Sequence, residues 1–248
     1  MTRAAAPTTS VPQLKSRDGI QHIAADAALV AMKDLRIELR SREILLTMGY
    51  FGFLVVLVFA FSFSGGGSLP TPPLVAGILW VAVALSGTLG LGRAFDRERE
   101  GDCLRALLLA PISRSAIYLG KMLGVLVFML AVELVVLPSV LFFFNVTMEP
   151  AILLRLLATL GLGTVGYAVL GTLLAAMLSR ARAKDVLLSV IFYPLVLPIL
   201  IVGVTATHAL LDPIVSTGAL GTWLRLLVVI DLVFGLVAVW IFEPLVTD

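Results

Sequence analysis

Most of this chain is too apolar to fold in water. Of its 248 residues, 60% are hydrophobic and only 14% are charged, against about 25% charged in a soluble domain. The chain has no aromatic-rich basic stretch that would suggest a nucleic-acid surface, and its net charge is only +2. Its single cysteine, Cys103, excludes an internal disulfide and a cysteine-rich metal site. Apolar blocks of about twenty residues, without the alternation of barrel strands, predict an all-α integral membrane protein.

The chain begins with a polar segment and an amphipathic one. Residues 1–25 are interrupted by two prolines and lack the apolar core of a signal peptide, which predicts a disordered cytoplasmic tail. Within residues 26–43, one helical face is apolar, at Ala28, Met32, Leu35 and Leu39. The other face is charged, at Lys33, Asp34, Glu38 and Arg40. This pattern predicts an interfacial helix on the membrane surface; a charged flank that only orients the first span is the alternative.

Six membrane-spanning helices are predicted to follow in one permease domain, residues 44–248. The predicted spans are residues 44–63, 74–92, 122–144, 151–178, 186–207 and 221–242. The fifth span contains Pro194 and Pro198, which predict a kink because proline removes helical hydrogen bonds. In the second and fourth spans small residues recur at every fourth position, which permits close contact between helices.

The basic residues alternate between the two sides of the predicted bundle. Sixteen of the 18 lysines and arginines lie before the first span, between the second and third, or between the fourth and fifth. The connections on the other side contain none. The positive-inside rule therefore predicts that both termini are cytoplasmic.

The connection between the second and third spans is the most charged part of the chain. Residues 93–121 read RAFDREREGDCLRALLLAPISRSAIYLGK. The residues predicted to form a docking surface are Phe95, Glu98, Glu100, Gly101, Leu104, Leu107, Leu108 and Pro111. A short helix over residues 103–110 would present its leucines to a groove on a soluble partner, and the proline would end it. The alternative is a solvated hinge whose leucines touch the bilayer.

No catalytic motif is found in the chain. The HExxH, GxSxG and GxxxxGK[ST] patterns are absent, and Gly120-Lys121 is preceded by Ser115 where a P-loop has its first glycine. We therefore expect a non-catalytic membrane subunit. Any ATP would be bound and hydrolysed by a separate partner.

Residues 95–121 resemble the cytoplasmic loop of the haem exporter permease (CcmB) family of bacterial cytochrome c maturation. The similarity continues through VELVVLP at residues 132–138 and FYPLVLPILI at residues 192–201, and it covers roughly residues 30–245. The chain departs from the family at Gly101, which precedes Asp102, whereas the family has its glycine directly before the leucine-rich turn.

This resemblance implies a permease similar to the ABC-2 type, in the cytoplasmic (inner) membrane, that acts in haem export and release of the haem chaperone. The implied partners are a CcmA-like ABC ATPase subunit, CcmC-like and CcmD-like haem-handling subunits and, indirectly, the chaperone CcmE. A homodimer within the complex is also expected. Haem would be a substrate, ATP would belong to the partner, and no cofactor is expected on this chain.

Two acidic residues are expected near the middle of spans. Glu133 lies in the third and Asp231 in the sixth, where an aspartate costs about 2.5–3.5 kcal/mol on translocon scales. They are interpreted either as a substrate pathway or proton relay, or as hydrogen-bonding groups between helices. The first interpretation fits a rival function, a proton-coupled secondary transporter. The other rival is an ABC-2 permease for a different substrate.

Three further residues are candidates for contacts at the outer side. Arg155 and Arg225 lie just inside the outer ends of their spans, and His208 lies in an outer connection. The arginines can extend to lipid phosphates or contact an anionic ligand such as haem propionates. His208 is a candidate axial haem ligand, although a lone loop histidine is more often an ordinary surface residue. No closed metal site is expected from two widely separated histidines.

Overall fold

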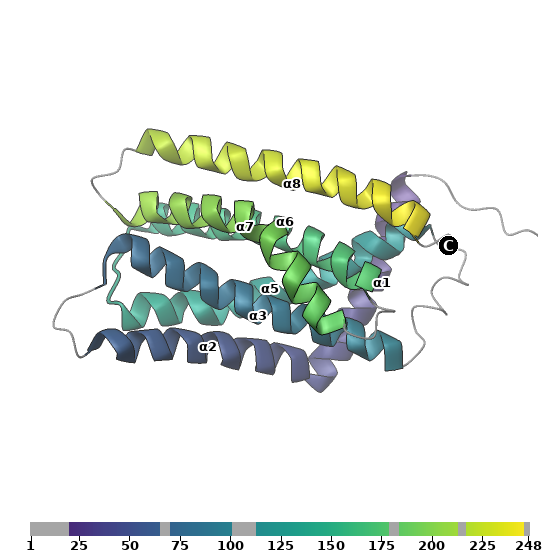
Figure 1. The fold of residues 1–248 in the computed structure, drawn as a ribbon, viewed down its shortest axis with the longest axis horizontal. Coiled ribbons are helices and arrows are strands. Elements are labelled where there is room, and N and C mark those ends of the chain that lie inside the picture. The colour runs from purple at the N-terminus through teal and green to yellow at the C-terminus, as the bar shows by residue number, and fades with distance from the viewer. Residues whose placement is uncertain (1–19, 65–69, 101–112, 179–183, 213–216, 246–248) are drawn as a thin grey trace, which may run out of the picture.

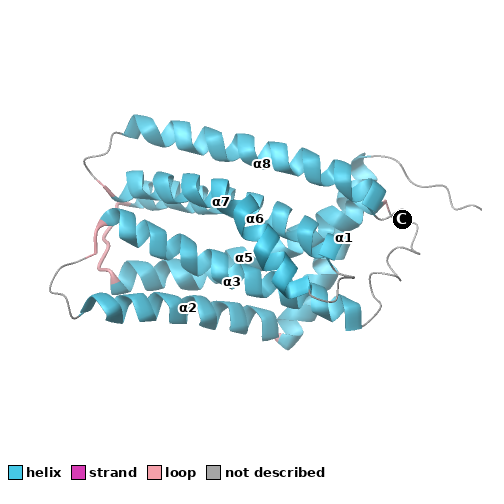
Figure 2. Cartoon of the chain, in the orientation of Figure 1, coloured by secondary structure: helices cyan, strands magenta, loops and turns pink. Residues whose placement is uncertain are grey.

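The computed structural model describes residues 20–64, 70–100, 113–178, 184–212 and 217–245. Every regular element within those ranges is an α-helix (Figure 2). The helices are α1 (Ile20–Ser41), α2 (Glu43–Ser64), α3 (Pro72–Glu100), α5 (Arg114–Phe143), α6 (Pro150–Leu178), α7 (Lys184–Leu211) and α8 (Thr217–Leu245). The predicted all-α class is confirmed.

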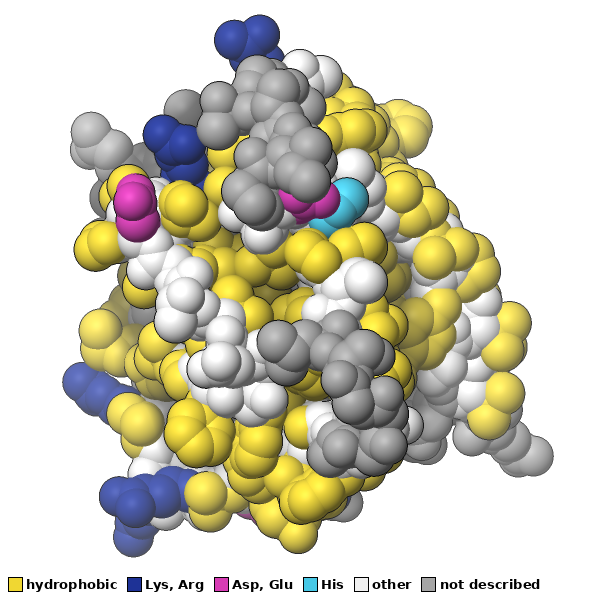
Figure 3. All heavy atoms as spheres, turned by 90° about the vertical axis from the view of Figure 1, so that its left-hand side faces the viewer, with side chains coloured by type: hydrophobic (Ala, Val, Ile, Leu, Met, Phe, Trp, Pro, Cys, Tyr) yellow, Lys and Arg dark blue, Asp and Glu magenta, His cyan; other side chains and the backbone are white. Residues whose placement is uncertain are grey.

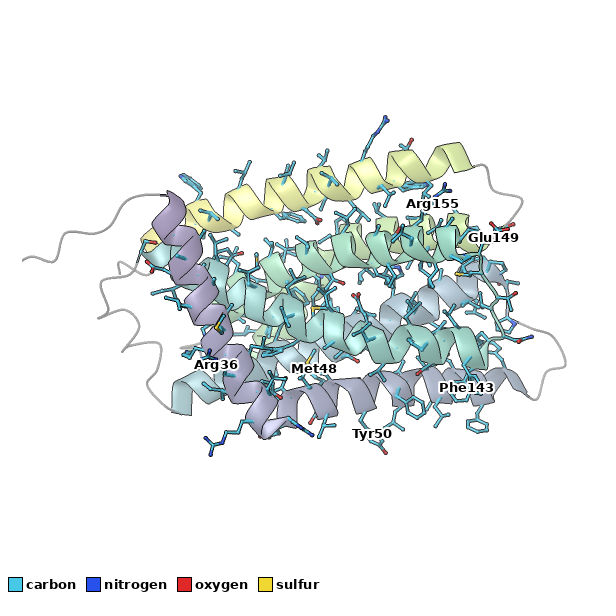
Figure 4. All side chains as sticks on the ribbon, turned by 180° about the vertical axis from the view of Figure 1, so that it is seen from behind. Arg36, Met48, Tyr50, Phe143, Glu149 and Arg155 are labelled. Atoms are coloured by element: carbon cyan, nitrogen blue, oxygen red, sulfur yellow. The ribbon has the colours of Figure 1, made fainter. Side chains whose placement is uncertain are left out.

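Six of these helices are long and apolar enough to cross a membrane. The spanning segments are Glu43–Phe63, Pro72–Arg93, Ser115–Phe143, Pro150–Leu178, Val186–Leu211 and Leu220–Ile241. The helix α1 is the exception, because its charges interrupt the apolar run, and it lies across one end of the bundle (Figure 4). The predicted fold of six spans with an N-terminal amphipathic helix is therefore confirmed.

The bundle is arranged with α2 and α8 on opposite sides and the other spans between them (Figure 1). The helix α2 packs against α3 and α5, and α8 packs against α6 and α7. The helix α6 packs against α5, α7 and α8, and its residues 166–175 are buried without a break. Side chains that bridge helices are therefore expected along α6.

Prolines bend the helix α7. Pro194 and Pro198 lie inside it, and Figure 1 shows α7 changing direction partway along its length. Each proline lacks the amide hydrogen that a helix needs at that position and crowds the carbonyl one turn earlier. Phe192, two residues before the first of these prolines, is buried, and its ring centroid lies 4.7 Å from that of Tyr167 in an edge-on arrangement.

A single residue separates α1 from α2. Arg42 has a φ of 57°, in the left-handed region, so the chain turns sharply between two helices. We call this turn with its flanking residues 38–45 the elbow. It sets α1 across the end of the bundle while α2 runs along it (Figure 4).

Candidate functional site

The predicted docking surface spans the end of α3 and the residues before α5 in sequence, and the start of α5 packs against α1. Phe95, Glu98 and Glu100 fall on the last turns of the α3 backbone. The remaining predicted residues, Gly101, Leu104, Leu107, Leu108 and Pro111, and the predicted short helix over residues 103–110, lie outside the described residues. What the structure does describe is how the two helices that flank this stretch are held.

The helix α3, which precedes this stretch, is attached near its end to the start of α2. The guanidinium Nη1 of Arg93 donates a hydrogen bond of 3.1 Å to Thr47 Oγ1 and lies 3.6 Å from a carboxylate oxygen of Glu43. The arginine and glutamate side chains are both exposed, so this ion pair contributes at most about 1 kcal/mol.

On the other side, α5 begins at Arg114, ahead of the predicted span start at residue 122. Ser113 caps it, because its hydroxyl accepts a hydrogen bond of 3.3 Å from the Ala116 amide. Lys121, which the sequence suggested should lie outside the membrane, falls within this helix and is buried in an ion pair with Asp34 of α1.

The elbow is held by a carboxylate that the sequence placed on a polar helix face. Glu38 is fully buried, and its Oε1 accepts hydrogen bonds from the amides of Ile44 at 2.7 Å and Leu45 at 3.0 Å. These amides belong to the first turn of α2 and have no partner within that helix, so Glu38 acts as an N-terminal cap from the preceding helix. Sequence reasoning missed this role because periodicity does not reveal which polar residue turns inward.

The intramembrane acid Glu133 on α5 is buried and has a partner. The hydroxyl of Thr164 on α6 donates a hydrogen bond to its Oε1. Glu133 therefore has a specific hydrogen-bond partner near mid-span, and the pair connects α5 to α6.

Asp231 on α8 has a different environment. Its carboxylate lies against Gly166 of α6, where a side chain would collide with Oδ1, and Ile199 of α7 lies beside the same glycine. Both carboxylate oxygens are shielded from solvent and have no hydrogen-bond partner among the described residues.

These two acids lie on opposite sides of α6. Thr164 and Gly166, the residues they contact, are two positions apart, which on an α-helix means about 200° around the axis. The structure therefore does not bring Glu133 and Asp231 together, and a direct proton relay between them would have to cross the α6 backbone.

Polar groups near the α6 centre also connect it to α3 and α7. Tyr167 donates to the carbonyl oxygen of Ala84 at 2.5 Å, and its hydroxyl lies 2.7 Å from that of Thr88. Thr88 donates in turn to the hydroxyl of Tyr193 at 3.1 Å. Sequence analysis did not identify this cluster, although its small residues Ala84 and Thr88 belong to a row that permits close helix contact.

Trp80 fills a slot between two glycines. Its indole packs on Gly163 of α6 and Gly203 of α7, and its Nε1–H donates a hydrogen bond of 3.0 Å to the Thr207 hydroxyl. The ring is 2% exposed, so this buried hydrogen bond satisfies its only polar atom. The contact joins α3, α6 and α7 in the half of the bundle away from α1.

The end opposite α1 carries the remaining predicted residues. Arg155 and Arg225 are exposed there, and Figure 4 shows Arg155 near Glu149 at that end. His208, which was predicted to lie in a connection, belongs instead to the last turn of α7, and its Nε2 lies 3.5 Å from a carboxylate oxygen of Asp212. Figure 3 views this end, where apolar side chains predominate. Among the described residues no group of three metal-ligating side chains forms.

Comparison with known proteins adds an independent observation. Over residues 26–244 the chain matches the family described as CcmB protein. A curated relative, heme exporter protein B of Pseudomonas aeruginosa, is 31% identical over 159 residues, which is 64% of this chain and 70% of the relative. The family match includes α1 from residue 26, all six spanning segments and the stretch between α3 and α5.

Proposed function

The chain belongs to the CcmB protein family, and on that premise we propose that it is the transmembrane permease subunit of an ABC transporter in haem export and haem-chaperone release during cytochrome c maturation. The observation that carries this proposal is the extent of the match, which takes in almost the whole membrane bundle. The relative's name, heme exporter protein B, supports haem as the substrate class.

We propose that this subunit is non-catalytic and depends on a CcmA-like ATPase. The sequence has no P-loop, so the ATP would be bound by that partner. CcmC-like and CcmD-like subunits would handle haem, and the chaperone CcmE would be released on the outer side. A second copy of this chain is expected in the complex, and the mass of the purified complex tests that expectation.

The proposed location is the cytoplasmic membrane with both termini in the cytoplasm. Support comes from the α1 end of the bundle, where Arg36, Arg40, Arg42 and Arg93 are exposed. Exposed apolar side chains of α1, including Met32 and Leu39, lie beside these arginines on the helix surface, as expected for a helix at a bilayer interface. Cysteine labelling from either side of the membrane tests the orientation.

The ATPase subunit is proposed to dock on the stretch from Phe95 to Pro111. Charge reversal at Glu98 and Glu100 should lower the amount of ATPase that co-purifies with the tagged chain in mild detergent, while the amount of chain in the membrane stays constant. The matched control is Glu149→Lys, a reversal of an exposed acid at the opposite end. Equal co-purification from the double variant and the control would refute docking at this stretch.

The substrate is tested on the same purified complex. A haem absorbance spectrum, or the presence of the chaperone, supports haem export; a complex that holds an ATPase but neither of these favours an ABC-2 permease for another substrate. Substrate movement by this chain without any ATPase would instead favour the secondary transporter.

Glu133 is proposed to act as a hydrogen-bonding group between helices rather than as a proton carrier. Support comes from its bond to Thr164 and from the position of α6 between it and Asp231. The variants Glu133→Gln and Asp231→Asn, singly and together, should retain haem-chaperone release. A loss of release with the protein still assembled would support a proton role.

At the outer end, Arg155 and Arg225 are proposed to contact lipid phosphates, because both side chains are exposed at a spanning-helix end. Axial ligation of haem by His208 through Nε2 would require that nitrogen to leave Asp212. His208→Ala should therefore leave haem content unchanged; a lost Soret band would show that the histidine is a ligand.

A further inference from the structure

The contact between α1 and the beginning of α5 is closer and more polar than a surface helix requires. Lys121 Nζ lies 2.7 Å from Asp34 Oδ2, and the two side chains are 10% and 18% exposed. One residue earlier, Gly120 faces α1 so closely that a Cβ there would lie 2.6 Å from Val30 Cβ and 2.7 Å from the Ala27 carbonyl oxygen. We call these residues the α1–α5 joint.

The joint combines two features that oppose separation of the helices. Removing Asp34 would take away the carboxylate that lies 2.7 Å from the largely buried Lys121 ammonium, which is unfavourable. The glycine lets the two backbones approach, which increases dispersion contact along the seam. The beginning of α5 and the middle of α1 are therefore expected to move together.

Both helices that flank the stretch between α3 and α5 are attached close to the same elbow. Arg93, near the end of α3, reaches Glu43 and Thr47 at the start of α2. Lys121, near the start of α5, reaches Asp34 on α1, just ahead of the elbow. Glu38 caps α2 from α1 and thereby fixes the two attachment points relative to each other.

We propose that Asp34 and Lys121 are positioning residues for ATPase docking: their ion pair joins α1 and the start of α5 into one unit that sets where the docking stretch is presented. The inference rests on the proposed function, because it assigns the pair a role only if an ATPase docks between α3 and α5. Neither residue is required to touch that partner.

The first test compares loss of the Asp34 charge with loss of the more exposed of the two lysines beside it. Asp34→Asn removes the charge that Lys121 faces, whereas Lys33→Gln removes the more exposed partner, whose Nζ lies 3.0 Å from Asp34 Oδ1. The number of ATPase molecules retained per permease chain should fall about tenfold for Asp34→Asn. It should be unchanged for Lys33→Gln and largely restored in Asp34→Glu, which retains the charge. A ratio for Asp34→Asn equal to that of the wild type overturns the inference.

A second variant covers the case in which Asp34→Asn fails to accumulate. The Cβ built on Gly124 lies 3.8 Å from Asp34 Cβ, which is within the usual range for a disulfide. In a Cys103→Ser background, Asp34→Cys with Gly124→Cys can therefore close the joint covalently. The oxidised complex should retain the ATPase and lose it on reduction; retention in both states overturns the inference.

These outcomes separate the two proposals. If the wild-type chain retains no ATPase, the proposed function fails before the joint is tested. If the wild-type chain retains it and both joint variants also retain it in full, docking stands and only the positioning role is rejected.

Discussion

The middle of α6 and the outer face of α8 show opposite relations between hydropathy and burial. The α6 span has a mean hydropathy of 1.7 and half of its most apolar window is buried, whereas the α8 span has a mean hydropathy of 2.5 and 11% is buried. In a soluble protein the more apolar helix would be the more buried one. Here the order is reversed.

The reversal follows from the solvent that a membrane protein faces. Lipid tails are as apolar as leucine, so burying a leucine between helices gains no hydrophobic free energy. Small and polar residues gain more from burial, since they allow close packing and hydrogen bonds. In α6, Gly163, Thr164 and Gly166 face Trp80, Glu133 and Asp231 respectively, while α8 exposes Leu232, Leu236 and Trp240.

The largest effect on stability is expected at Gly163 of α6, where there is no room for a side chain. Gly163→Ala would push a methyl group into the Trp80 indole and should lower the free energy of unfolding by about 2–3 kcal/mol. Thermal unfolding in mild detergent measures this. The matched control is Gly161→Ala, on the same helix but with no atom within 4 Å of the added Cβ. Equal stability of the two variants would show that Trp80 does not occupy the slot.

A smaller loss is expected from the hydrogen bond at Glu133. Thr164→Val keeps the volume but removes the hydroxyl that Glu133 accepts from, and should cost about 1–2 kcal/mol. Thr205→Val on α7 is the control, because that hydroxyl donates only to the Ile201 carbonyl of its own helix. If the control loses as much stability as Thr164→Val, the bond between α5 and α6 contributes nothing measurable.

Removing the carboxyl group of Asp231 should raise the free energy of unfolding instead of lowering it. Its carboxylate has no partner among the described residues, so Asp231→Val replaces a buried polar group by an apolar one of similar size and should raise the unfolding free energy by about 1 kcal/mol. The comparison uses the same thermal measurement on the isolated chain. A decrease instead would mean that the carboxyl group is hydrogen-bonded in the folded protein.

The smallest effect is expected on the outer face of α8. Leu236 is 73% exposed, so Leu236→Ala should change the unfolding free energy by less than about 0.5 kcal/mol. If the assembled complex, but not the isolated chain, is clearly destabilised by this change, the α8 face contacts another protein of the complex or a second copy.

Much of the fold could be predicted from local features of the chain. The lengths of the apolar blocks predicted six spans. The stripe of Ala28, Met32, Leu35 and Leu39 predicted an amphipathic helix, and all of these side chains except the partly buried Leu35 are exposed on α1. Only part of the candidate site could be predicted in this way. Glu133 and Asp231 were recognised because a charge is conspicuous in an apolar run, but their different partners were not.

The sequence alone therefore determined the helical class, the number of spans, the orientation expected from its basic residues and the resemblance to a permease family. Each of these depends on neighbouring residues or on composition within about twenty positions. Only the tertiary structure decided that Lys121 meets Asp34, that Trp80 lies between Gly163 and Gly203, and that α6 separates the two acids. Such contacts join residues dozens of positions apart, and they depend on how helices pack, which neither hydropathy nor periodicity specifies.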